Sequence, residues 1–148
     1  MPTRAMIALA FATVLFALAA ATSARPQTAA FAEGQMWSIR PPAAESVRVV
    51  IGRLEPWSEG TIVHVSILGV PVPDGPVGAP ATRRTIVGHL PIEERALVAS
   101  VDRLLATDAA PAPTFAAGYQ QWEDAKGGIF TVTVAEAIDV VLAALVRR

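Results

Sequence analysis

Runs of apolar residues separated by proline, glycine and charged residues divide the first half of the chain into strands. Val47–Leu54 and Thr61–Val70 are rich in valine and isoleucine, which favours β-strands. Between them, residues 55–60 include Pro56 and Gly60 and predict a hairpin loop. Both runs are apolar at nearly every position, so we expect this antiparallel hairpin near the centre of a sheet.

Helical periodicity becomes prominent after residue 90. A short strand is expected at Thr85–Val87, and Pro91 occupies a position typical of first-turn prolines, which predicts a helix over Pro91–Ala106. The expected inward face of this helix consists of apolar residues at helical spacing: Leu97, Val98, Val101, Leu104 and Leu105.

Cap signals predict two further helices. Thr114 is a candidate N-cap for a short helix that ends near Lys126, with Gly127 as its C-terminal stop. A strand is expected over Gly128–Val132. Thr133 and Glu136 have the spacing of a capping box and predict a last helix that continues to about Val146. Its expected inward residues are Ile138, Val141, Leu142 and Leu145.

This order of elements, strands first and helices later, predicts an α+β fold. We expect a small antiparallel sheet packed against about three helices and preceded by an N-terminal signal helix. The expected organisation is a signal peptide at 1–24, a flexible leader at 25–34 and a single α+β domain at 35–148.

The first two dozen residues have the layout of a secretory signal peptide. Met1–Arg4 carries one positive side chain, Ala5–Ala21 carries no charge, and small residues follow. We expect cleavage after Ala24, with cleavage after Ala21 as the close alternative, and a periplasmic or secreted mature protein. An uncleaved signal that anchors the chain in the inner membrane is the other possibility, because an apolar run of this length is at the lower limit for a membrane span.

Composition excludes several classes of function. The chain has no cysteine, which excludes disulfides, thiolate zinc sites, cysteine nucleophiles and an acylated lipoprotein anchor. Its formal net charge is −1, or about −2 once Arg4 is removed with the signal, so no nucleic-acid partner is expected. Contact with the membrane is expected only through the signal segment during export.

Several short strings resemble members of an uncharacterised family of small exported proteobacterial proteins. They are Val50–Trp57, Val63–Ile67, Gly88–Pro91 and the segment from Tyr119 to Phe130. The resemblance covers most of residues 35–145. It implies export, and no activity is assigned to such proteins.

Residues 69–82 contain four prolines and three glycines and predict a long loop. Loops of this length in compact domains are either functional or disordered, and the sequence leaves both possibilities open. Asp74 in this loop and Arg83 and Arg84 after it are the charged groups of a candidate binding surface. Solvated surface charge is the simpler interpretation of the arginine pair.

Aromatic side chains supply the other candidate binding groups. Phe115, Tyr119 and Trp122 are spaced i, i+4 and i+7, so three rings share one face of a short helix, with Gly118 beside them. Turned inward, the rings belong to the core. If exposed, Tyr119 and Trp122 resemble the anchors of protein interfaces. Trp57, in the predicted hairpin loop, either folds over the sheet or contacts a partner.

Polar residues allow a catalytic alternative, although no cofactor-binding or catalytic motif is present. His64 and Ser66 share a strand face and could act as base and nucleophile if a carboxylate oriented the imidazole. His89 and Glu93 could join His64 around a zinc ion. In the structural alternative, His64 is a hydrogen-bonded sheet residue, His89 lies in a turn and Glu93 is a first-turn helix charge.

Two hypotheses follow. The first is a non-enzymatic periplasmic binding or interaction module that requires no cofactor, with an envelope protein or a small ligand as partner and with its site at Trp57, Asp74, Arg83, Arg84, Tyr119 and Trp122. The second is a small envelope hydrolase or metal-assisted enzyme that uses His64, Ser66, His89 and Glu93. A cleft with His64 beside a carboxylate or His89 favours the enzyme, whereas an exposed aromatic patch favours the binding module.

Overall fold

The computed structural model describes residues 30–41, 43–72, 81 and 83–146. The elements within these ranges are β1 (Met36–Ile39), β2 (Arg48–Trp57), β3 (Gly60–Val72), β4 (Arg83–Glu93), α1 (Glu94–Ser100), β5 (Val101–Ala106), α2 (Phe115–Asp124) and α3 (Val134–Val146). The strands form one antiparallel sheet in the order β4-β3-β2-β1-β5, which confirms the α+β fold. The expected signal helix lies outside the described residues.

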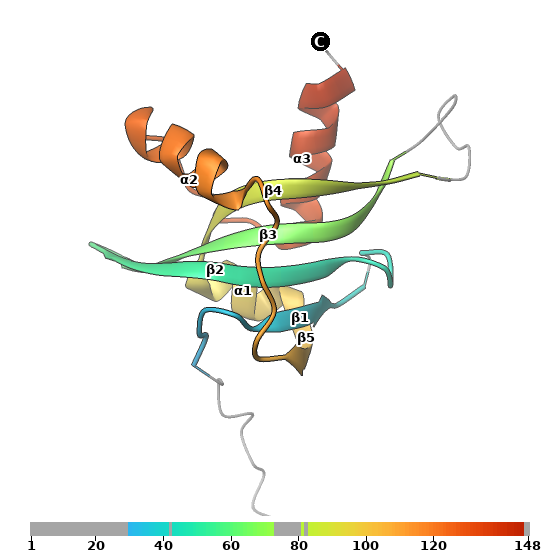
Figure 1. The fold of residues 1–148 in the computed structure, drawn as a ribbon, viewed down its shortest axis with the longest axis horizontal. Coiled ribbons are helices and arrows are strands. Elements are labelled where there is room, and N and C mark those ends of the chain that lie inside the picture. The colour runs from blue at the N-terminus through green and yellow to red at the C-terminus, as the bar shows by residue number, and fades with distance from the viewer. Residues whose placement is uncertain (1–29, 42, 73–80, 82, 147–148) are drawn as a thin grey trace, which may run out of the picture.

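Helices cover both faces of this sheet. On one face, alternate residues of β2, β3 and β4 pack with α1 and α3 in an apolar core that includes Val49, Ile51, Val63, Val65, Ile67, Leu90, Ile92, Leu97, Val134, Ala137 and Ile138. On the other face, the segment that follows β5 crosses in front of the strands and leads into α2 (Figure 1). None of the described helices is long and apolar enough to cross a membrane.

The predicted central hairpin is present as β2 and β3. Its pairing extends further than expected, to Pro56↔Thr61 and Trp57↔Gly60, so only Ser58 and Glu59 form the turn. Gly60 has a φ of 144°, a conformation that L side chains rarely adopt, which explains a glycine at this position.

The prediction of a single helix over Pro91–Ala106 is wrong. Pro91 belongs to β4, an edge strand, where a missing N–H is tolerated. The edge is extended by Phe130, which donates its N–H to the Pro91 carbonyl and accepts the N–H of Glu93, each at 2.9 Å. The helix is therefore reduced to the seven residues of α1.

The last third of that expected helix is strand β5. It pairs with β1, which the sequence analysis missed, through Trp37↔Leu104 and Ile39↔Val101. Consequently Leu104 and Leu105, assigned to an inward helix face, are 42% and 43% exposed.

The two later helices are confirmed, whereas the strand expected over 128–132 is reduced to one isolated bridge between Ile92 and Phe130. At the start of α3 the capping box forms: Glu136 Oε2 accepts the Thr133 N–H at 2.9 Å and the Thr133 hydroxyl at 2.7 Å. Of the expected inward residues of α3, Ile138 is buried and Val141 and Leu142 are partly buried against the core. The side chain of Leu145 lies outside the described residues.

The described part of the expected flexible leader, residues 30–34, contacts the sheet. Phe31 is 9% exposed and meets the Trp37 ring edge-on at 5.7 Å between centroids. Gly34 donates its N–H to Ile51 O at 2.8 Å.

Candidate functional site

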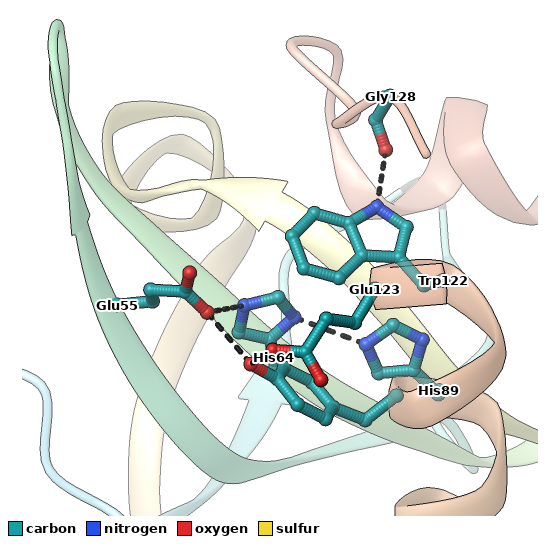
Figure 2. Close-up of polar contacts among 7 residues, drawn as sticks. Glu55, His64, His89, Trp122, Glu123 and Gly128 are labelled. Atoms are coloured by element: carbon teal, nitrogen blue, oxygen red, sulfur yellow. Dashed lines mark hydrogen bonds and ion pairs between the residues drawn. The ribbon is translucent and has the colours of Figure 1, made fainter. Parts of the chain in front are cut away.

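The principal polar cluster is a row of three side chains on the α2 face of the sheet: Glu55 from β2, His64 from β3 and His89 from β4. His64 Nδ1 lies 3.0 Å from His89 Nε2, and His64 Nε2 lies 3.3 Å from Glu55 Oε2 (Figure 2). The second contact does not have hydrogen-bond geometry and is a close electrostatic contact. We call Glu55, His64 and His89 the polar row, and the two histidines the imidazole pair.

A β-bulge at Gly52 brings Glu55 into this row. Before the bulge Ile51 is opposite Val65 on the core face, and after it Arg53 is opposite His64. A one-residue shift moves the following side chains to the other face of a sheet, so Arg53 and Glu55 project toward α2. Gly52 also leaves room for Phe115, because a Cβ there would lie 2.4 Å from Phe115 Cζ.

Helix α2 covers the imidazole pair with aromatic rings. Tyr119 and Trp122 meet the His64 ring edge-on at 4.9 and 4.8 Å between centroids. His64 is fully buried and Tyr119 is 9% exposed. A Cβ at Gly118 would lie 2.6 Å from His89 Cβ, so glycine is what permits this close approach of the helix to β4.

Tyr119 of α2 also contacts the polar row. Its hydroxyl donates a 3.0 Å hydrogen bond to Glu55 Oε2, the same oxygen that faces His64, and lies 3.5 Å from Glu123 Oε1. The guanidinium of Arg53 lies 4.6 Å from the centroid of the Tyr119 ring, a cation–π arrangement. Trp122 donates its indole N–H to Gly128 O at 2.9 Å (Figure 2).

Only one arrangement of protons satisfies the whole row when both imidazoles are neutral. The contact between the two rings needs one N–H donor and one acceptor. We assign the proton to His89 Nε2, because His64 then carries its own proton on Nε2, where the Glu55 carboxylate attracts it. The near-coplanar rings, 15° apart with centroids at 5.2 Å, fit this edge-to-edge bond.

Burial favours the neutral form of both imidazoles. The pKa of His64 lies below its ordinary value because the cost of burying charge exceeds the attraction of Glu55, and Arg53 lowers it further. Burial and the neighbouring His64 lower the pKa of His89 to about 4. Burial, followed by the bond to Glu55, raises the pKa of Tyr119 above its usual value.

Ser66 lies on the same strand face as His64 and is fully buried, but the structure gives it other partners. Its hydroxyl donates to Gly88 O at 2.7 Å and accepts the N–H of Ala112 at 2.9 Å. Ser66 therefore links the segment before α2 to β4, at a position where the pairing of β3 with β4 shifts register. The hydroxyl proton that a nucleophilic serine would deliver to His64 is held by a carbonyl instead.

Glu93 is not brought to the imidazole pair. It is paired in register with Ile62, and its carboxylate contacts Arg95 Nε at 2.6 Å. Within the described ranges no group of three or more histidine, cysteine, aspartate or glutamate side chains is placed to hold a metal ion. The polar row is linear, whereas a metal site needs ligands that converge on one point.

The residues expected to form a binding surface are dispersed. Trp57 is at the far end of the hairpin, partly buried, with an indole N–H that has no partner within the part of the chain described here. Arg83 and Arg84 lie at the start of β4, and Arg84 donates to Ser46 Oγ at 2.6 Å. Asp74 lies outside the described residues. Tyr119 and Trp122 point inward, so the described part of the chain brings none of the expected aromatic anchors into an exposed patch.

An open groove of about 560 Å³ lies beside Tyr119, between β2 and α2. Its walls are Glu33, Gly52, Arg53, Leu54, Phe115, Ala116, Tyr119, Gln120 and Glu123. We call this feature the β2–α2 groove. It combines the positive charge of Arg53 with the carboxylates of Glu33 and Glu123.

Arg53 and Glu55 are site residues that were not predicted from the sequence. The local pattern predicts Glu55 in the hairpin loop, and nothing in the sequence near Arg53 or Glu55 indicates a contact with His64 or Tyr119. A glycine inside an apolar strand is a known sign of a bulge, so Gly52 is the signal that could have placed Arg53 and Glu55 on the opposite face.

Comparison with family models, with curated protein sequences and with solved structures finds no match for this chain.

Proposed function

We propose that this protein is an exported, non-enzymatic binding module whose site is the β2–α2 groove. The observation that carries the proposal is the groove itself: an open concavity within the size range of small-molecule sites, with charged and aromatic residues in its walls. Tyr119, expected among the binding residues, lines the groove.

The charges of the groove favour a ligand that carries both a carboxylate and a cationic group. Arg53 can pair with a carboxylate, and the exposed side chain of Glu123 or Glu33 can pair with an amine or guanidinium. An amino-acid derivative, a peptide end or an exposed loop of an envelope protein has this chemistry.

The burial of His64 and the existing partners of Ser66 and Glu93 weigh against the hydrolase alternative. His64 has no exposed surface, Ser66 is bonded to backbone groups, and Glu93 pairs with Arg95. A substrate would therefore need α2 to move before it could reach His64. The groove is open without such a movement.

Export is part of the proposal. The charged start, apolar run and small residues of 1–24 support cleavage near Ala24 and release into the periplasm. Detection of a mature N-terminus near Arg25 in the periplasmic fraction would support it, and retention of an uncleaved chain in the inner membrane would contradict it.

The binding site can be tested by filling the groove. Ala116 lines the groove and is exposed, so Ala116→Trp places an indole in it. Ala117, the next residue on α2, is exposed but is not part of the groove wall, and Ala117→Trp is the matched control. Wild type and both variants are used to capture ligands from envelope extract, with quantitative mass spectrometry for proteins and small molecules.

A ligand retained by wild type and Ala117→Trp and lost from Ala116→Trp supports a binding module that uses the groove. A ligand retained equally by all three places the site elsewhere. Absence of any retained ligand, with hydrolysis of ester or amide probes that Ala116→Trp leaves intact, contradicts the proposal.

A further inference from the structure

The helix that forms one wall of the β2–α2 groove is also the cover of the imidazole pair. Phe115, Ala116, Tyr119 and Gln120 of α2 line the groove, while Tyr119 and Trp122 of the same helix pack on His64. Any change that displaces α2 from the sheet therefore changes the groove. The geometry of the polar row supports the inference below, and its effect on ligand binding rests on the proposed function.

We propose that the imidazole pair is an acid-sensitive contact that keeps α2 docked, so that protonation of both rings releases the helix and opens the groove wall. The 3.0 Å contact between His64 Nδ1 and His89 Nε2 exists only while one of these nitrogens lacks a proton. Once both rings are protonated, two N–H groups face each other and the hydrogen bond becomes a repulsion.

The structure can accommodate one added proton. A protonated His64 keeps its contact with Glu55 and donates from Nδ1 to His89 Nε2, provided that His89 carries its proton on the other nitrogen. No comparable hydrogen-bond arrangement accommodates the second proton. It places two like charges in adjacent rings, one of them fully buried, and burial of an uncompensated charge is strongly unfavourable.

The surrounding charges do not neutralise a doubly protonated pair. The charged and titratable groups that face it are Glu55 and Arg53 from β2, together with Tyr119 and Glu123 from α2. Glu55 and Glu123 offer two negative charges and Arg53 adds a positive one, so their net charge of −1 does not balance the +2 of the doubly protonated pair. Tyr119 and Trp122 pack on the fully buried His64, so displacement of these rings together with α2 gives water access to its charge.

The burial-induced lowering of both pKa values agrees with this geometry. His89 takes up its proton in the folded state at a pH of about 4, and His64 below its ordinary value. We therefore expect α2 to be docked at neutral pH and to open as the pH approaches 4. In an exported protein, whose surroundings follow the external pH, this couples ligand binding to acidity.

Amide hydrogen exchange tests this directly in the ligand-free protein, purified as the cell processes it. Protection factors, corrected for the intrinsic effect of pH on exchange, are compared at pH 7 and pH 4 for α2 and for the β2–β3 hairpin. Protection of α2 should fall by about tenfold or more while the hairpin stays protected. His89→Gln, which keeps an N–H donor beside His64 but cannot take up a proton, should remove most of this fall.

Tyr119→Phe is the matched control, because it weakens the docking of α2 without removing a histidine. It should lower α2 protection at both pH values and leave the pH dependence in place. Equal α2 protection at pH 7 and pH 4 in wild type, or the same fall in His89→Gln as in wild type, would overturn the inference. Neither result depends on the ligand, so loss of the acid-sensitive contact and failure of the Ala116→Trp experiment can be told apart.

Discussion

At the scale of residues, Glu55 is the centre of the polar row. A single carboxylate oxygen accepts the Tyr119 hydroxyl and faces His64, so it connects β2 to β3 and to α2. Arg53 and Tyr119 link the same cluster to the wall of the groove. The side chains that stabilise the helix over the sheet are therefore next to those proposed to bind a ligand.

Removal of the Tyr119 hydroxyl tests this connection. Tyr119→Phe keeps the ring but deletes the hydrogen bond to Glu55, and we expect a loss of about 1–2 kcal/mol in the free energy of unfolding, because the acceptor is a charged group. Gln121→Ala, on the exposed side of the same helix and outside the groove wall, should change it by less than about 0.5 kcal/mol. Urea unfolding measures both, and equal effects of the two variants would contradict the assigned role of Tyr119.

The face on which a side chain lies was predictable from the sequence where local spacing determines it. The i, i+4, i+7 spacing of Phe115, Tyr119 and Trp122 correctly predicts one shared helix face, and period-two alternation correctly places His64 and Ser66 on one strand face. The partner of each residue was not predictable in this way. Glu55 reaches His64 only because a bulge shifts the strand register, and Ser66 bonds to Ala112, which is 46 positions away in sequence.

At the scale of elements, α2 ends in a way that the sequence only partly indicates. Lys126 N–H donates to Glu123 O and Gly127 N–H donates to Trp122 O, the two hydrogen bonds of a Schellman motif. The left-handed position, φ 48°, is occupied by Lys126 and not by the glycine that follows. Gly127 is needed for another reason, since a Cβ there would lie 2.3 Å from Trp122 Cδ1.

This arrangement predicts a stabilising substitution. Lys126→Gly removes the cost of a left-handed conformation in a residue with a Cβ, and we expect a gain of about 0.5–1 kcal/mol in the free energy of unfolding. Lys126→Ala keeps a Cβ and should give no comparable gain. Denaturant unfolding of both variants measures the difference, and a stabilised alanine variant would show that the lysine side chain, not the backbone, is the source of strain.

The segment from Pro91 to Ala106 shows why elements can be misassigned. Its apolar residues fit a helical period, but Ile39 and Trp37 of β1 supply a partner strand for residues 101–106, and the pairing outweighs the local preference. The outer part of this segment then leaves Leu104 and Leu105 exposed at the edge of the sheet. Strand β1 has only four residues, so its pattern of apolar positions is too short to predict its pairing with β5.

At the scale of the whole molecule, the imidazole pair makes stability depend on pH. Both folded-state pKa values lie below that of an unfolded histidine, so the folded chain favours the neutral rings. The pair's contribution is fully present above a pH of about 6.5 and is lost as the pH falls toward 4, because only the unfolded chain binds protons readily in that range. We expect a total loss of about 1–3 kcal/mol.

Chemical denaturation at a series of pH values measures this loss. Carboxylates also take up protons near pH 4, so the informative quantity is the difference between wild type and His89→Gln, which should show a flatter profile between pH 6.5 and 4. Parallel profiles for the two proteins would show that the imidazole pair does not contribute to the acid dependence of stability.

In the proposed function, the protein binds a partner through the β2–α2 groove and not through its acid–base groups. The most direct measurement is a residue-resolved map of amide exchange for the protein with and without a ligand captured from envelope extract, at pH 7. We expect increased protection over Arg53–Leu54 and the first two turns of α2, with β5 unchanged. Protection confined to β5, or to β4 around His89 with the groove unchanged, would contradict it.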